Sequence, residues 1–83
     1  MFTGIVTAVG TVRAARRDQS GLALTIAAPY RGLALGESIA VNGACLTVER
    51  KGRGWFRVHV VPTSLDRTRL GDLHRGARVM TVV

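Results

Sequence analysis

Apolar and polar residues alternate in short segments along most of this chain. Leucine or isoleucine occupies positions 22, 24 and 26, and phenylalanine or valine occupies positions 56, 58 and 60. A period of two residues is typical of a strand with one buried face. Together with the content of β-branched residues, this alternation predicts strands at residues 2–12, 22–27, 38–41, 44–50, 55–61 and 77–83.

Polar and glycine-containing segments separate the predicted strands. Residues 16–21 and 51–54 are predicted to be polar turns, and Asn42-Gly43 is a dipeptide that strongly favours a tight hairpin. Residues 29–37 form a longer connection with room for one helical turn. Pro62-Thr63-Ser64 is typical of a helix start, with Thr63 or Ser64 as the N-cap, and this helix can extend to about residue 71.

Six short strands with one or two short helical turns predict an all-β fold, a six-stranded antiparallel Greek-key barrel. Closure of the barrel would protect apolar strands such as residues 79–83, which are prone to aggregate as open edges. We expect residues 1–83 to form a single barrel domain. A chain of this size buries only about 60–65% of its unfolded surface, so self-association would add stability.

The composition narrows the class of protein. Apolar residues make up 47% of the chain, which argues against disorder. No apolar run approaches the roughly 18 residues that a membrane span needs, and we see no signal peptide at the N-terminus. The single cysteine cannot form a disulfide within the chain, and this favours a reducing compartment, so we expect a cytoplasmic protein. One cysteine and two distant histidines give no metal-ligand spacing, and we expect no metal site.

The charge is strongly positive, with 12 Lys and Arg against 5 Asp and Glu. Such a balance attracts nucleic acid, phosphorylated ligands or acidic surfaces. The basic residues are scattered, however, and no block of five or six forms. We therefore favour a solvated, arginine-rich surface over a true nucleic-acid face.

A thiol and a hydroxyl stand two residues apart in the strand predicted after the Asn42-Gly43 turn. Residues i and i+2 of a strand point to the same face, so Cys45 and Thr47 are predicted to project side by side. Leu46 and Val48 are predicted to project to the other face. The strand after the Asn42-Gly43 turn is therefore a candidate polar site, formed by Cys45 and Thr47.

Three segments, in this order along the chain, resemble the N-terminal lumazine-binding domain of the riboflavin synthase family. They are Met1-Phe2-Thr3-Gly4-Ile5-Val6, residues 36–48 with Asn42-Gly43-Ala44-Cys45-Leu46-Thr47-Val48 at their centre, and residues 62–73, which begin Pro62-Thr63-Ser64. The resemblance covers essentially the whole chain and implies a riboflavin synthase-like barrel. Enzymes of that family carry two such barrels in tandem and work as trimers without a metal or cofactor. They convert two molecules of 6,7-dimethyl-8-ribityllumazine into riboflavin and a pyrimidinedione, so the resemblance implies that this chain is one half of that arrangement.

The resemblance also implies which residues contact the ligand, which would be riboflavin, FMN or 6,7-dimethyl-8-ribityllumazine. They are Gly4, Ile5, Val6, Cys45, Leu46, Thr47, His59, Val60, Val61, Pro62, Thr63 and Ser64. A flat heteroaromatic ring needs a mostly apolar slot with a few polar groups that fix its orientation. Gly4 would permit close approach of the backbone, and Thr47 and Ser64 could hydrogen-bond the ring or the ribityl chain.

Cys45 and Phe2 are the candidate catalytic residues on the same resemblance. Each has a structural alternative, because a free cysteine is often a small buried apolar residue and Phe2 could plug the barrel. A nucleophilic thiol would also need a positive neighbour to lower its pKa. For His59, on the polar side of its strand, we favour surface exposure over catalysis. We expect surface or structural roles for the four carboxylates Glu37, Glu49, Asp66 and Asp72.

Two departures from the family pattern affect the functional hypothesis. Thr63-Ser64 stands where the family usually has Glu-Thr, which removes a carboxylate from the edge of the implied site. The second barrel, which supplies a histidine and a serine at positions equivalent to Ile5 and Cys45, is missing from this sequence. General base catalysis needs a titratable group within reach of the proton, and a homodimer of this domain would lack that histidine.

Three hypotheses follow. The favoured one is a flavin- or lumazine-binding domain, a single-barrel relative or an isolated domain, that forms a homodimer or higher homo-oligomer. The second is an active riboflavin synthase, a transferase that works as a homo-oligomer or with another chain. The third is a small barrel that binds single-stranded nucleic acid, which the few scattered aromatic residues disfavour.

Overall fold

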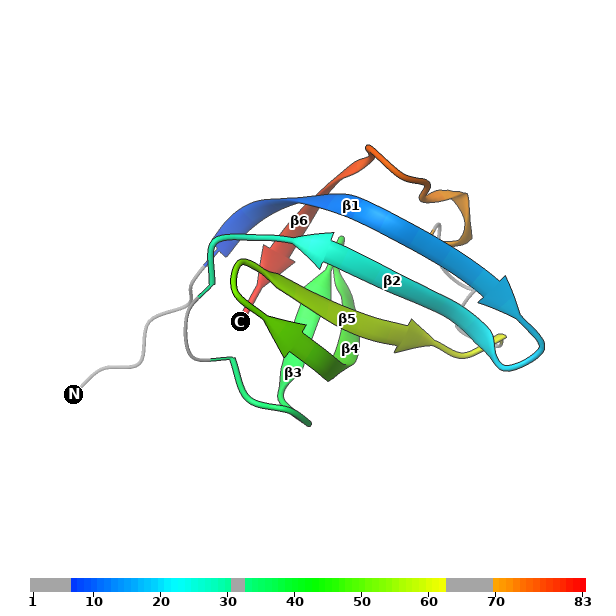
Figure 1. Cartoon of the computed structure of the whole chain (residues 1–83), viewed down its shortest axis with the longest axis horizontal. Coiled ribbons are helices and arrows are strands. Elements are labelled where there is room, and N and C mark those ends of the chain that lie inside the picture. Colours follow the sequence, from blue (N-terminus) through cyan, green and yellow to red (C-terminus); the bar gives the residue numbers. More distant parts are fainter. Residues whose placement is uncertain (1–6, 31–32, 63–69) are drawn as a thin grey trace.

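The computed structural model describes residues 7–30, 33–62 and 70–83, and these form a closed antiparallel barrel (Figure 1). The strands are β1 (Thr7–Asp18), β2 (Gly21–Ala27), β3 (Ser38–Val41), β4 (Ala44–Gly52), β5 (Trp55–Val60) and β6 (Arg78–Val82). A short 3-10 helix, η1, spans Leu70–Asp72. The strands pair in the order β1-β2-β5-β4-β3-β6, and β6 closes the barrel by pairing with β1. The predicted all-β, six-stranded barrel is confirmed.

Strand β1 continues to Asp18, six residues past its predicted end at Val12, so one predicted turn was wrong in its extent. The polar segment 16–21 was expected to be a turn, but β1 continues through Arg16 and Arg17 to Asp18, which pairs with Gly21. The backbone ladder with β2 holds this polar part in strand conformation although its side chains are mostly exposed. A shift in register between Val12 and Ala14 marks a bulge, which bends a strand. This bend lets β1 pair with β6 over its first half and with β2 over its second.

The helical predictions are only partly within the described residues. The start of the helix predicted at Thr63 or Ser64 lies outside them, as do residues 2–6 of the first predicted strand. Near its predicted end, Leu70–Asp72 forms the 3-10 turn η1, with Leu70 buried. In the connection 29–37, the described residues contain no helical turn.

The core fills the barrel with side chains from alternate positions of the strands. On β5, Phe56, Val58 and Val60 are fully buried, as the alternation predicted. Gly10 on β1 is buried, and a Cβ there would lie 2.7 Å from Ile26 Cγ2 on β2, so the close packing of the two strands favours glycine at this position. The core also contains Leu24 and Ile26 of β2, so side chains fill the interior of the barrel.

The hairpin predicted at Asn42-Gly43 is present. Asn42 and Gly43 have φ angles of 50° and 87°, and Val41 pairs with Ala44 across the turn. Positive φ at both central residues is the geometry of a type I′ hairpin, which glycine and asparagine favour. Asn42 also links the hairpin to β6, because its backbone N–H donates to Met80 O and its Oδ1 accepts from Met80 N, each at 2.8 Å.

Candidate functional site

The outward face of β4 presents the thiol and hydroxyl that the alternation predicted. Cys45 and Thr47 are exposed, whereas Leu46 and Val48 are buried at 8% and 1% exposure. Cys45 follows the type I′ turn directly through Ala44, so the hairpin fixes the register of the strand. The prediction that Cys45 and Thr47 share one face is confirmed.

A shallow groove of about 310 Å³ lies where β4 meets β5 and is open to solvent. Its lining residues are Cys45, Leu46, Thr47, Glu49, His59 and Val61. Leu46 and the 48%-exposed Val61 supply apolar surface, and the other four supply polar groups. Apolar walls with a few polar groups are typical of a small-molecule site.

The structure brings together five of the predicted ligand residues: Cys45, Leu46, Thr47, His59 and Val61. The side chain of Val60 is fully buried in the core and does not line the groove. Pro62 is exposed beside the groove at the end of β5 but is not part of its lining. The remaining predicted residues, Phe2, Gly4, Ile5, Val6, Thr63 and Ser64, lie outside the described residues.

His59 joins the groove to the tip of the β1–β2 hairpin. Its Nε2 lies 2.7 Å from the carbonyl oxygen of Ser20, and since a carbonyl only accepts, Nε2–H donates in this bond. The Ser20 hydroxyl and backbone N–H in turn donate to Asp18 Oδ1 at 2.6 Å and 2.8 Å. Both bonds lower the pKa of Asp18, and the bond from the Ser20 hydroxyl has the larger effect. The charge of His59 lowers this pKa by a smaller amount. The ring of His59 is thus held in place rather than free at the surface.

Glu49 lines the groove, although the sequence predicted only a surface or structural role for it. Its carboxylate oxygen Oε2 accepts from Arg57 Nε at 2.7 Å, and both side chains are about one-third exposed. The alternation that places Cys45 and Thr47 outward extends to Glu49, so this signal was present in the sequence. The pairing with Arg57 depends on β4 and β5 being neighbours in the barrel, which the alternation does not reveal.

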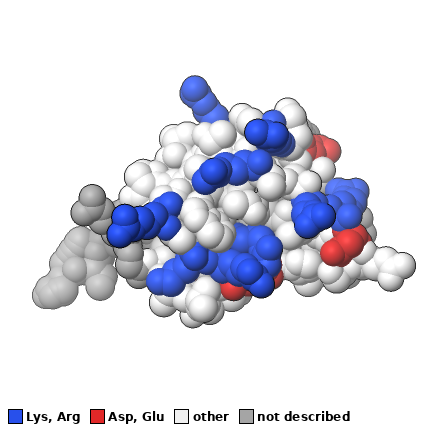
Figure 2. Space-filling view, in the orientation of Figure 1, with Lys and Arg blue, Asp and Glu red and all other residues white. Residues whose placement is uncertain are grey.

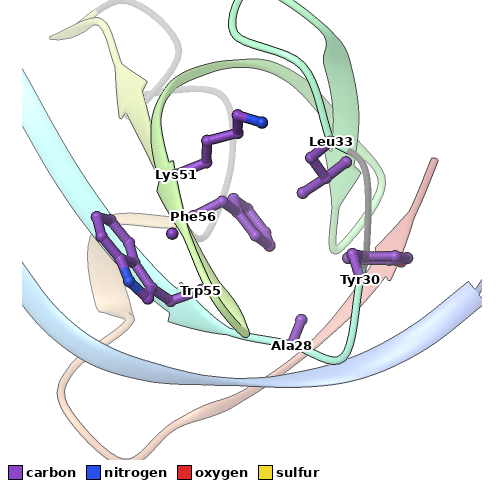
Figure 3. Close-up of a pocket in the computed structure, with 7 residues that line it drawn as sticks. Ala28, Tyr30, Leu33, Lys51, Trp55 and Phe56 are labelled. Carbon is purple, nitrogen blue, oxygen red and sulfur yellow. The ribbon is translucent and has the colours of Figure 1, made fainter.

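A second, smaller cavity lies at the turn end of the β4–β5 hairpin (Figure 3). It measures about 50 Å³ and is lined by Ala28, Tyr30, Leu33, Lys51, Gly52, Trp55 and Phe56. The rings of Tyr30 and Phe56 pack with centroids 6.4 Å apart. A space of this size holds about one or two water molecules and excludes a fused ring system, so this cavity belongs to the packing of the barrel.

Basic side chains lie at many places on the face of the molecule that Figure 2 shows. In Figure 2 the Lys and Arg residues are scattered across the visible face, with a few acidic residues between them. Two aromatic residues among those described are committed to packing: Phe56 is fully buried, and the hydroxyl of Tyr30 bonds Thr81. Within residues 7–30, 33–62 and 70–83, no cluster of three His, Cys, Asp or Glu could hold a metal ion.

Comparison with known proteins identifies the barrel. The sequence profile described as "Lumazine binding domain" matches residues 3–81. The chain belongs to the lumazine-binding domain family. It is 44% identical over 81 residues to riboflavin synthase of Bacillus amyloliquefaciens and 41% identical over 81 residues to that of Bacillus subtilis. It is also 42% identical over 82 residues to riboflavin synthase of Mycobacterium tuberculosis.

Each of these matches covers 95% of this chain but only 38% to 41% of the relative. The chain therefore spans about two fifths of the length of the curated riboflavin synthases that it matches. The family profile includes the whole β4–β5 groove. Among the helices of the described residues, none is long and apolar enough to cross a membrane.

Proposed function

We propose that this lumazine-binding domain binds a ribityl-substituted pteridine or flavin, such as 6,7-dimethyl-8-ribityllumazine or riboflavin, in the β4–β5 groove. The observation that carries the proposal is the position of Cys45, Leu46 and Thr47. These residues belong to the segment that resembles the family's ligand-binding motif, and they line a groove much larger than the cavity beside Phe56. The apolar surface of Leu46 and Val61 suits a flat ring, and Thr47 suits its polar edge.

The groove is open, and we propose that a second copy of the chain covers it in a homodimer. A row of uncharged residues, Thr7, Val82, Ala40 and Cys45, crosses β1, β6, β3 and β4 next to the groove. The neighbouring pair Val9 and Met80 is 58% and 49% exposed. Apolar surface beside an open site supports a symmetric partner, and the expected particle has twice the 8.9 kDa chain mass by native mass spectrometry with riboflavin present.

Binding is tested by titrating the protein into riboflavin and following the quenching of flavin fluorescence. We expect saturation with the native chain and weaker binding by Thr47→Ala. The lost hydrogen bond is worth about 1 kcal/mol, which raises Kd about fivefold. Thr11→Ala changes the same residue type at an exposed position of β1, outside both the groove and the proposed dimer face, and serves as the control. A titration without saturation contradicts the proposed function, and an unchanged Kd in Thr47→Ala removes Thr47 from the site.

A second candidate function is catalysis, with Cys45 and Phe2 as the proposed catalytic residues. The exposed thiol in the groove and the riboflavin synthases among the relatives favour it. The exposed, unpaired cysteine also supports our placement of the protein in the cytoplasm. Incubation with 6,7-dimethyl-8-ribityllumazine, followed by the appearance of riboflavin absorbance, separates catalysis from binding alone. Turnover that Cys45→Ser abolishes supports catalysis, and no turnover above the uncatalysed rate leaves a binding domain.

A further inference from the structure

The groove contains a carboxylate whose partner is already fixed. Val48 pairs with Val58 and Arg50 pairs with Arg57, so a bulge leaves Glu49 and Arg50 together opposite Arg57. Glu49 uses this position to accept from Arg57 Nε through Oε2. Because this bulge places Glu49 directly beside Arg57 of the neighbouring strand, the Glu49 side chain is held at the edge of the groove.

The Glu49 carboxylate retains a free acceptor. Within the part of the chain that the structure describes, it accepts at Oε2 alone, so Oε1 remains for a ligand. An ionised carboxylate only accepts hydrogen bonds, and its bonds to donors are stronger than those between neutral groups. A ligand beside Glu49 must therefore present hydroxyl or N–H groups.

The other polar groups of the groove point to the same ligand chemistry. The Nε2–H of His59 is committed to Ser20 O, so Nδ1 is the only ring nitrogen that remains for a ligand. Thr47 can donate or accept. Arg57 pairs with Glu49, and its Nε is committed to that carboxylate. The groove edge thus favours neutral donors and opposes a phosphate, although the chain as a whole carries a net charge of +7.

We propose that Glu49, held by Arg57, is a specificity-determining residue that accepts a hydrogen bond from a hydroxyl or ring N–H of an unphosphorylated ligand and repels a phosphorylated one. This inference rests on the proposed function, namely that the groove binds a ribityl-bearing ring. It separates riboflavin from FMN, which share a ring and differ in the phosphate on the ribityl chain.

The test compares the Kd values of riboflavin and FMN, measured by fluorescence quenching, for the native chain and three variants. The native chain is expected to bind riboflavin at least about tenfold more tightly than FMN. Glu49→Gln keeps the shape and removes the charge, and it should reduce this ratio about five- to tenfold, mainly by improving FMN binding. Arg57→Met removes the neutralising partner and should increase the ratio. Asp72→Asn makes the same charge change outside the groove and should leave the ratio unchanged.

The outcomes distinguish the inference from the proposed function. A ratio in Glu49→Gln within twofold of the native value, or a lower ratio in Arg57→Met, overturns the role of Glu49 while riboflavin binding stands. Failure of the native chain to bind either flavin overturns both. Circular dichroism melting curves check that each variant is folded, and a charge effect in Glu49→Gln should shrink at high salt.

Discussion

Thr81 places a hydroxyl group inside the closed barrel, where its side chain is fully buried. The hydroxyl donates to Ala8 O at 2.8 Å and lies 2.7 Å from the Tyr30 hydroxyl. Tyr30 also donates to Thr81 O at 2.9 Å. These bonds connect β6 to β1 and to the chain after β2, at the seam where the barrel closes.

Replacing Thr81 with Val should therefore destabilise the barrel by about 1–2 kcal/mol, because it leaves the partly buried Ala8 O with one partner fewer. The free energy of unfolding in urea measures this loss. Tyr30→Phe removes the other hydroxyl, and the double variant should lose less than the sum of the two, since both act in one network. Equal stability of Thr81→Val and the native chain would contradict this account.

Asp18 gives the hairpin tip a dependence on pH. The hydrogen bonds that Ser20 donates to Asp18 lower the pKa of this carboxyl from its ordinary value of 3.8. Ionised Asp18 therefore stabilises the folded chain. This stabilisation is present above about pH 4 and is lost as the pH falls through the lower pKa of the folded state. The stability difference between the native chain and Asp18→Asn should be constant near neutrality and shrink below pH 3.8. A difference that stays constant down to about pH 2 would exclude this role for Asp18.

Among the elements, the β3–β4 hairpin positions the groove most directly. Its turn sets the register that points Cys45 and Thr47 outward, and Asn42 ties it to Met80 of β6. The hairpin therefore connects barrel closure to the orientation of the site residues.

Asn42→Ala should destabilise the chain by about 1–2 kcal/mol, because alanine tolerates the positive φ poorly and cannot accept from Met80 N. Asn42→Gly restores the backbone freedom without the side-chain bond, so it should lie between the alanine variant and the native chain. Urea unfolding measures both effects. A glycine variant as unstable as the alanine variant would show that the φ angle contributes nothing.

Local signals in the sequence predicted five of the strands to within two residues and the Asn42-Gly43 turn, because alternation and turn chemistry act over a few positions. The polar half of β1 was missed because Arg16 and Arg17 give no apolar alternation, and only the ladder with β2 holds them in a strand. Cys45 and Thr47 could be predicted from their spacing. The bonds from Arg57 to Glu49 and from His59 to Ser20 could not, since each joins different strands or loops.

At the scale of the whole molecule, the packed barrel leaves its surface as the place for a ligand. The larger described groove lies on the β4–β5 surface, and the smaller cavity of about 50 Å³ cannot admit a flavin ring. On the face shown in Figure 2, the positive charge is scattered and forms no single continuous track, which agrees with a small-molecule site rather than a nucleic-acid face.

The most direct test of this account is a titration of the isotope-labelled chain with riboflavin, followed by amide chemical shifts in NMR spectra. We expect saturable changes in amide chemical shift that are largest at residues 45–47, at Glu49 and at residues 59–61. The residues around the smaller cavity, such as Ala28 and Leu33, should change little. Absence of saturable shifts, or shifts centred on the smaller cavity, would contradict the central claim that the β4–β5 groove holds the ligand.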